Sequence, residues 1–275
     1  MVDVAAVIAR VDALGAPFRV RAVVGAPDAG NSPSVGASPG FHDDDTAVFS
    51  STWFAAAELA DPASGEALRM VGTHAASRGM PVGRHAASLA FQRYCHRLCG
   101  VAAASWLLED TALDLQARNV SVRFVEGTPD LVALDRAAGT VGAGADELLG
   151  IVLDHHLLPL ARTLAGETGP GLGNLTGNMA AGFAGALRIL SRHPELGLDA
   201  YALLPRAQEL LNTKPELRRG GEFRVLDGPR GPRLQYDRRS CCHWYAAPDG
   251  RFCSWCSRLS HDERTCRFVD AMAEE

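Results

Sequence analysis

The sequence lacks the features that mark several common classes of protein. Its 27 Lys and Arg residues do not outnumber its 32 Asp and Glu residues, and the formal net charge is −5, whereas nucleic-acid-binding domains are normally basic. The best apolar run, Leu98 to Leu108, is shorter than the roughly 20 residues that a membrane span requires. We therefore expect neither a nucleic-acid partner nor a transmembrane segment.

Nucleotide-binding signatures are also lacking. There is no Walker-type Gly-Lys-Ser/Thr, and the glycines of 169–177 (GPGLGNLTG) do not have the spacing of a dinucleotide-binding loop. A helix rather than a strand is predicted before them, so we expect a helix-to-helix turn with Asn174 as N-cap. Because no nicotinamide or flavin motif is found either, any electrons that the protein uses must come from a separate donor.

The N-terminus lacks the pattern of a secretory signal peptide. Asp3 stands where a basic residue would be needed, and Arg10 interrupts the apolar run. We expect a cytoplasmic protein, at most peripheral to the inner face of the membrane. Structural disulfides are rare in that reducing compartment, and clustered cysteines there point to metal or redox chemistry.

Local patterns predict a mainly helical fold with small β-hairpins (α+β). Apolar periodicity and turn residues predict the elements. Helices are expected at 2–14, about 85–116 with a break near Asp110, 145–165 with a bend at Pro159, 174–192, 198–212 and 261–272. Strands are expected at 17–24, 120–125, 131–135, 223–226 and 233–236. We predict a helical body over 1–219, with a flexible loop at 25–46, and a C-terminal hairpin and cysteine tail over 220–275.

The tail carries most of the cysteines, and their spacing is distinctive. Of seven cysteines, the five in the last 35 residues are Cys241, Cys242, Cys253, Cys256 and Cys266. A Cys-x-x-Cys pair can wrap two sulfurs around one metal atom, and the turn at Pro248-Asp249-Gly250 can fold that pair back onto the adjacent cysteines. Neighbouring side chains of a strand point to opposite faces, so the adjacent cysteines can share a site only where the backbone turns sharply.

Thiolates suit either an iron–sulfur cluster or zinc. Structural zinc sites usually separate paired ligands by two to four residues, so adjacent cysteines fit zinc less well than a wider diiron core. Our hypothesis is that Cys253 and Cys256 hold one iron of a [2Fe–2S] cluster and Cys241 and Cys242 the other. A Cys₄ zinc staple and unligated cysteines are the alternatives.

Residues around the tail cysteines are candidates for tuning such a site. The segment from Leu217 to Arg258 has nine arginines and four acids. Arg238 and Arg239, which flank the cysteines, would favour the reduced form of an anionic cluster or dock an acidic partner or anionic chelate; a solvated surface is the alternative role. The other candidates are His243 as a hydrogen-bond donor, and Trp244, Tyr245, Phe252 and Trp255 as shielding, stacking or simple packing.

Other cysteines and histidines have plainer interpretations. Cys95 and Cys99 share a helix face at i, i+4 spacing, and we expect them to be buried small apolar residues rather than ligands. Cys266 is expected to be a spare thiol. Adjacent helical residues such as His155 and His156 point about 100° apart, so we expect core or surface histidines instead of a shared ligand site.

The tail resembles the C-terminal signature of FhuF-like siderophore-iron reductases. The matching residues are Cys241-Cys242-x₁₀-Cys253-x₂-Cys256, with Arg238-Arg239-Ser240 before the pair and Trp244-Tyr245 after it. Weaker likeness to the family's helical body lies at Phe91–Leu98 and from Gly173 through Asn178 to Ala181. The likeness covers roughly residues 80–260, and only the tail is diagnostic.

The resemblance implies an iron–sulfur oxidoreductase of the cytoplasm. In the family the four cysteines hold an atypical [2Fe–2S] cluster, which here would reduce siderophore-bound Fe(III) to Fe(II) by one electron and release the iron. The expected partners are a ferric siderophore of hydroxamate type and a separate electron donor. The alternative is a siderophore-binding protein with a zinc tail; a siderophore synthetase is disfavoured because no ATP-binding signature is found.

Overall fold

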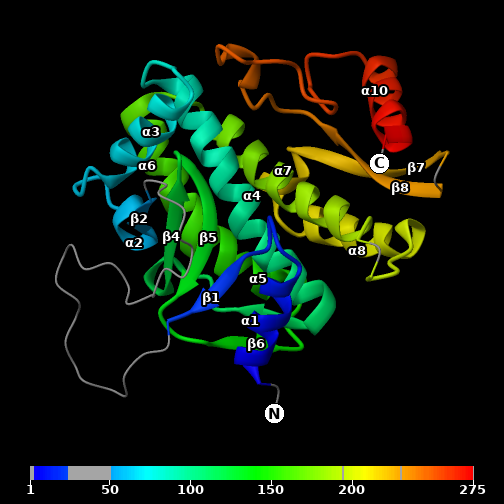
Figure 1. The fold of residues 1–275 in the computed structure, drawn as a ribbon, viewed down its shortest axis with the longest axis horizontal. Coiled ribbons are helices and arrows are strands. Elements are labelled where there is room, and N and C mark those ends of the chain that lie inside the picture. Colours follow the sequence, from blue (N-terminus) through cyan, green and yellow to red (C-terminus); the bar gives the residue numbers. More distant parts are fainter. Residues whose placement is uncertain (1–2, 24–50, 194, 230, 275) are drawn as a thin grey trace.

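Two long helices form the centre of the molecule. The structure is a computed structural model that describes residues 3–23, 51–193, 195–229 and 231–274. Helix α4 (Arg84–Glu109) and helix α7 (Leu172–Leu190) pack closely along one another, as Figure 1 shows. Their facing sides are rich in Ala and Gly, which lets the backbones approach. Helix α4 ends where Asp110 takes a left-handed conformation with φ of +47°. The interruption expected near Asp110 is present, but the helix expected to continue to 116 is wrong, because residues 111–113 form a strand.

A four-stranded sheet packs against the helices. Its order is β1-β5-β4-β2, with β1 parallel to β5 and the other pairs antiparallel. The β4–β5 hairpin predicted from the sequence is confirmed, and it turns through Glu126 and Gly127, which both have positive φ as such tight turns require. The strand bounds are Val20–Ala22 for β1, Ser51–Ala55 for β2, Val120–Val125 for β4 and Thr128–Leu134 for β5.

Shorter helices and a two-stranded sheet complete the body. The helices are α1 (Val4–Ala13), α2 (Ala56–Ala60), α3 (Glu66–Ser77), η1 (Ala117–Asn119), α5 (Ala145–Leu149), η2 (Gly150–Leu157), α6 (Leu158–Thr168), α8 (Ala200–Thr213) and α9 (Pro215–Arg218). The small sheet pairs β3 (Thr111–Leu113) with β6 (Gly139–Val141). The bend expected at Pro159 is replaced by the π-helical η2 just before it, so that Pro159 sits in the first turn of α6, where its missing N–H is tolerated.

One helical stretch has the length and apolar character of a membrane span. It runs from Ala145 to Thr168 with a mean hydropathy of 1.2, and 56% of its most apolar window is buried inside the protein. Its buried residues include Leu148, Val152 and Leu160. Core helices of globular proteins pass the same test of length and composition, and the burial of these residues is that of a core helix.

The C-terminal segment lies along one end of the two central helices. A hairpin of β7 (Gly221–Gly228) and β8 (Gly231–Arg238) packs on α7 and α8, and a loop containing the turn η3 (Trp244–Ala246) crosses α4. Helix α10 (His261–Glu274) then returns beside β7, as the red end of the chain shows in Figure 1. The predicted α+β class is confirmed, whereas the strand β2 was not predicted, and the loop expected at 25–46 lies outside the described residues.

Candidate metal centre

Strand β8 delivers the adjacent cysteines to a sharp turn of the backbone. Cys241 and Cys242 follow the end of β8, and His243 has a left-handed φ of +67°. The His243 N–H donates to Cys241 Sγ at 3.4 Å. The chain therefore reverses directly after the pair, and the reversal keeps the Cys241 side chain within reach of the backbone beyond Cys242.

The second cysteine pair is brought back by two further turns. The predicted turn at Pro248 and Asp249 is present, and the Gly250 N–H donates to the carbonyl of Ala247 at 2.8 Å. A Cβ at Gly250 would lie 2.2 Å from the Trp244 carbonyl oxygen, so only glycine allows the loop to close this tightly. The Cys256 N–H then donates to the carbonyl of Cys253 at 3.0 Å, which folds the Cys-x-x-Cys segment into a turn.

The four tail cysteines converge on one region. Cys242 and Cys256 are buried, and Cys241 and Cys253 are half-buried. Hydrogen bonding of the Cys241 and Cys253 thiols to the Cys242 sulfur lowers the pKa of Cys242 and raises the pKa of both partners. Among the described residues, no group of three or more metal-binding side chains is placed so that it could hold one metal ion. The thiols are thus neighbours, but they do not form a closed mononuclear cage.

Polar donors without partners surround these sulfurs. Nη1 of Arg238, Nδ1 of His243, Nε1 of Trp244 and Nε2 of His96 are all buried and make no hydrogen bond within the described part of the chain. A buried donor without a partner costs about 1–3 kcal/mol. A thiolate cluster, which is anionic and accepts hydrogen bonds at sulfur, would satisfy several of them. The donor set therefore fits an anionic sulfur-bound group.

A small cavity lies between the cysteines and helix α4. Its volume is about 110 Å³, and its lining includes Cys242, Cys253, Trp244, Trp255 and His96. Two thiols and two unpartnered donors thus face the same space. The indole rings of Trp244 and Trp255 and the side chains of Gln92 and Arg93 complete its walls, and charge on sulfur is felt more strongly in such a partly enclosed space than in water.

Arg238 places a positive charge next to the cysteines. Its side chain is buried, with 1% of the residue exposed. Its Nη2 donates to Oδ1 of Asn178, its Nε donates to Oγ of Ser240 at 3.4 Å, and no carboxylate pairs with it among the described residues. The guanidinium also lowers the pKa of Cys242, after the hydrogen bonds from the two thiols. A buried cation needs an anion nearby, and Cys242, whose pKa is lowered, is the cysteine that fits this role.

A polar network between the central helices holds the adjacent cysteines. Asn174 Nδ2 donates to the Cys241 carbonyl, and Ser88 Oγ donates to the Cys242 carbonyl at 3.2 Å and to Oδ1 of Asn174 at 2.7 Å. Asn178 Nδ2 donates to Ser88 Oγ at 3.1 Å. Helices α4 and α7 thus fix the backbone of both cysteines. The expected N-cap role of Asn174 is wrong, because α7 begins after Gly171 and Asn174 faces the tail instead.

A glycine on α7 makes room for the start of the cysteine loop. A Cβ at Gly177 would lie 1.9 Å from Oγ and 2.4 Å from Cβ of Ser240. Ser240 accepts from Arg238 and immediately precedes Cys241. The sequence gives no local signal for this role, since a glycine inside a helix contacts the tail only through the fold. Ser88, Asn174, Asn178 and Gly177 are therefore the site residues that sequence reasoning missed.

The tail aromatics pack against arginines and one another. Trp255 lies 5.8 Å from Tyr236 between ring centroids and 4.9 Å below the guanidinium of Arg188. Arg258 stacks on Tyr245 at 4.2 Å, and Arg251 lies over Trp244 at 5.2 Å. The His243 ring contacts His85 at 4.9 Å, whereas Phe252 is 40% exposed. These contacts are those of the packing role expected for the aromatics.

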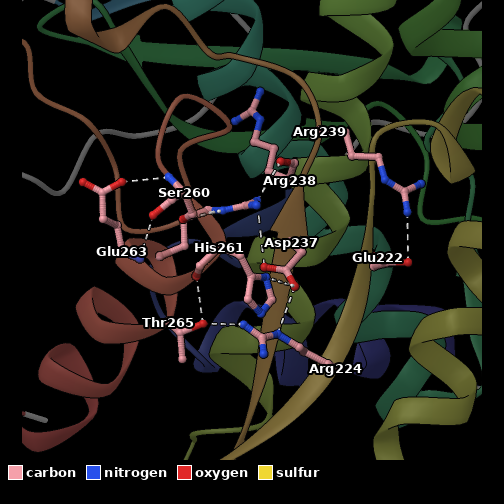
Figure 2. Close-up of polar contacts among 10 residues, drawn as sticks. Glu222, Arg224, Asp237, Arg238, Arg239, Ser260, His261, Glu263 and Thr265 are labelled. Carbon is pink, nitrogen blue, oxygen red and sulfur yellow. Dashed lines mark hydrogen bonds and ion pairs between the residues drawn. The ribbon is translucent and has the colours of Figure 1, made fainter.

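Arg224 and Arg239 are matched by acids rather than directed at the cysteines. Asp237 pairs with Arg224 at 2.9 Å, and it has Arg264 and His261 at 3.9 and 4.0 Å. Arg239 pairs with Glu222 at 2.9 Å and is half-exposed. Figure 2 shows both groups, with Arg238 pointing away from the Asp237 cluster. Of the two arginines that flank the cysteines, the structure places Arg238 in the site, while Arg239 faces Glu222.

The remaining cysteines have the environments expected of them. Cys95 and Cys99 are fully buried on α4, and burial raises the pKa of both thiols. Cys266 is exposed on α10. His156 is buried and lies between the Tyr94 hydroxyl and the Leu115 carbonyl, each at 2.6 Å from a ring nitrogen, while His155 is exposed. None of these residues joins the tail cysteines.

The site gathers four cysteine side chains, a buried guanidinium and a small cavity at one end of the α4–α7 pair. That combination suits binding of a sulfur-ligated metal group and exchange of electrons with it. Neither a known family model nor a curated protein matches this sequence.

Proposed function

We propose that the protein is a ferric-siderophore reductase that transfers one electron at a time to chelated Fe(III). The proposal rests on one observation: Cys241, Cys242 and Cys253 lie together beside Arg238, which is buried and pairs with no carboxylate among the described residues. A single structural ion would not require a buried cation beside its thiolates. A redox group benefits from one, because that cation stabilises the additional negative charge of the reduced form.

Each group of residues at the site has its own role in the proposed reaction. Cys241, Cys242, Cys253 and Cys256 would hold a [2Fe–2S] group, which supplies one-electron chemistry when bound. Arg238 raises its reduction potential, while Trp244 and Trp255 limit access of water. Ser88 and Asn174 hold the Cys241 and Cys242 carbonyls and so prevent the loop from moving when charge changes.

The electron balance requires two partners. One electron passes to Fe(III) in the chelate and leaves Fe(II), which hard oxygen donors bind less tightly. The protein is thereby oxidised by one electron, which a separate one-electron donor protein must return, because the sequence has no nicotinamide or flavin motif. The chelator itself is unchanged, and iron leaves as Fe(II) in the cytoplasm.

A binding protein of another class is the second candidate. The Cys253–Cys256 turn also has the spacing of a zinc knuckle, and a Cys₄ zinc tail would fasten the loop to a siderophore-handling body without redox activity. Colour separates the two candidates. An iron–sulfur protein is red-brown and bleaches with dithionite, whereas a zinc protein stays colourless.

The proposed reaction can be tested by stoichiometry. Protein reduced with dithionite and freed of excess reductant is mixed anaerobically with a ferric siderophore, and Fe(II) is trapped with a chromogenic chelator. We expect one Fe(II) for each protein oxidised, and we expect Cys242→Ser to abolish the reaction. Full Fe(II) production by Cys242→Ser would show that the cysteines are not the electron carrier.

A further inference from the structure

A second, larger cavity adjoins the one beside the cysteines. Its volume is about 320 Å³, at the lower end of the range for ligand pockets. Helices α4 and α7 form one wall, and the turn before β1 and the start of β5 form the other. Figure 1 shows the turn between α1 and β1 beside the central helices. Its lining includes Arg93, His96, Arg97, Pro17, Pro129 and Ile189.

The two cavities share a wall. Arg93 and His96 line both the larger cavity and the smaller one, which is bounded by Cys242 and Cys253. The negative charge of Cys242 acts on Arg93 as well as on His96. A ligand in the larger cavity would therefore be separated from the thiols by one layer of side chains.

The lining of the larger cavity is cationic and contains no acid. Arg93 makes no hydrogen bond or ion pair within the described ranges. Arg97 is anchored by Nε and Nη2 to the Pro129 carbonyl, at 3.2 and 3.0 Å, and its Nη1 is buried without a partner. Burial lowers the pKa of both guanidiniums, that of Arg97 to about 10. Both stay charged at neutral pH, so each is an available donor for an anion.

Nearby carboxylates are already committed elsewhere. Asp130, next to the lining residue Pro129, pairs with Arg123 at 2.8 Å and Arg19 at 3.4 Å. Asp249, whose charge reaches Arg93, pairs with Arg78 at 2.8 Å. The positive charge of the cavity is thus left for a ligand.

We infer that this cavity binds the carboxylate of a ferric chelate, so that the substrate is a complex of net negative charge. The inference rests on the proposed function and deepens it, because it selects substrates by charge and not by the iron-binding group. Arg93 is the main contact, and Arg97 donates its free nitrogen. Hydroxamate chelates that carry a carboxylate are favoured over neutral or cationic ones.

A charge series on one chelator tests the inference without electron transfer. Ga(III) replaces Fe(III) because it is not reduced. Desferrioxamine B carries a free ammonium group, its N-acetyl derivative is neutral there, and its N-succinyl derivative ends in a carboxylate, while the hydroxamates are unchanged. By calorimetry at low salt we expect the Ga(III) complex of the succinyl form to bind about tenfold more tightly than that of the parent, the size of one charge-assisted hydrogen bond.

Two arginine variants locate the effect. Arg93→Gln should remove the charge preference, weakening the succinyl complex more than the neutral one, because Arg93 makes no other hydrogen bond or ion pair among the described residues. Arg118→Gln, an exposed arginine on η1 away from the cavity, should keep the preference in full. Arg97 is less suitable for this test, since its substitution also frees the Pro129 carbonyl.

Each outcome decides between explanations. Equal affinities across the charge series, or a preference that survives Arg93→Gln, would overturn the inference. Full competition by metal-free succinate at the same concentration would also overturn it, because the cavity would then be a general anion site. The proposed function is judged separately by the Fe(II) stoichiometry, so equal affinities for the three Ga(III) complexes, found beside one Fe(II) per protein in that assay, would refute only the inference.

Discussion

Helix α4 and the tail both contain buried cysteines, but the surroundings of the two sets differ. Cys95 and Cys99 are fully buried among packed apolar side chains, and burial is the main cause that raises their thiol pKa values. Cys242 is also buried, yet its pKa is lowered by the two neighbouring thiols and by Arg238. Burial alone therefore does not set the pKa of a cysteine in this protein. The neighbouring donors and charges decide it.

Substituting one cysteine from each region gives the largest expected contrast. Cys242→Ala should lose nearly all bound iron and sulfide, because one ligand in four is removed. Cys99→Ala should keep full metal content and unfold about 1 kcal/mol more easily, since it loses only a small buried side chain. Metal analysis and urea titration of both variants measure the contrast. Equal metal content in the two would remove the distinction between the regions.

The body should also carry a pH dependence at His156. Burial lowers the pKa of His156 to about 4, against about 6.5 in an unfolded chain. Between pH 6.5 and 4, His156 is protonated in the unfolded state but stays neutral in the folded state. The contribution of the neutral His156 to the free energy of unfolding is therefore full above pH 6.5 and is lost as the pH falls towards 4. The loss amounts to about 3 kcal/mol.

Variants at the two adjacent histidines isolate this effect. His156→Gln should have a lower free energy of unfolding at pH 7, and this free energy should decrease less between pH 6.5 and 4 than it does in the unmodified protein. The exposed His155→Gln should follow the unmodified protein at every pH. Urea titrations at several pH values measure both, and parallel curves for all three proteins would mean that His156 is not the titrating group.

Two adjacent arginines sharpen the comparison within the tail. Arg238→Gln removes a buried guanidinium bonded to Asn178, which should cost about 2 kcal/mol of stability and lower the reduction potential of the bound group. Arg239→Gln loses only an exposed pair with Glu222 and should change stability by less than about 1 kcal/mol. Redox titration and thermal unfolding test both. The same potential in the two variants would contradict the role given to Arg238.

Two glycines of α7 test the contact between this helix and the start of the cysteine loop. Gly177→Ala should destabilise the protein by about 1–2 kcal/mol, because its Cβ would overlap Ser240 and displace the start of the cysteine loop. Gly173→Ala meets nothing within 4 Å and should stabilise the helix by up to about 1 kcal/mol. Thermal unfolding gives the sign of each change. Stabilisation by both substitutions would show that the loop does not rest on α7 there.

Local patterns accounted for most helices and for both hairpins, because periodicity and turn residues act over a few positions. They did not reveal strand β2, the parallel pairing of β1 with β5, or the π-helical η2, since those depend on segments far apart or on tertiary packing. The four tail cysteines stood out by spacing. Ser88, Asn178 and Arg93 did not, because only the packing of α4 against α7 and the tail gives each its role.

The composition of the wild-type centre tests the central claim most directly. Protein purified anaerobically is analysed for iron, acid-labile sulfide and zinc, and its EPR spectrum is recorded after reduction with dithionite. The account predicts about two iron and two sulfide per chain, with an EPR signal of one unpaired electron that appears only on reduction. A colourless protein with one zinc per chain and no such signal would contradict it.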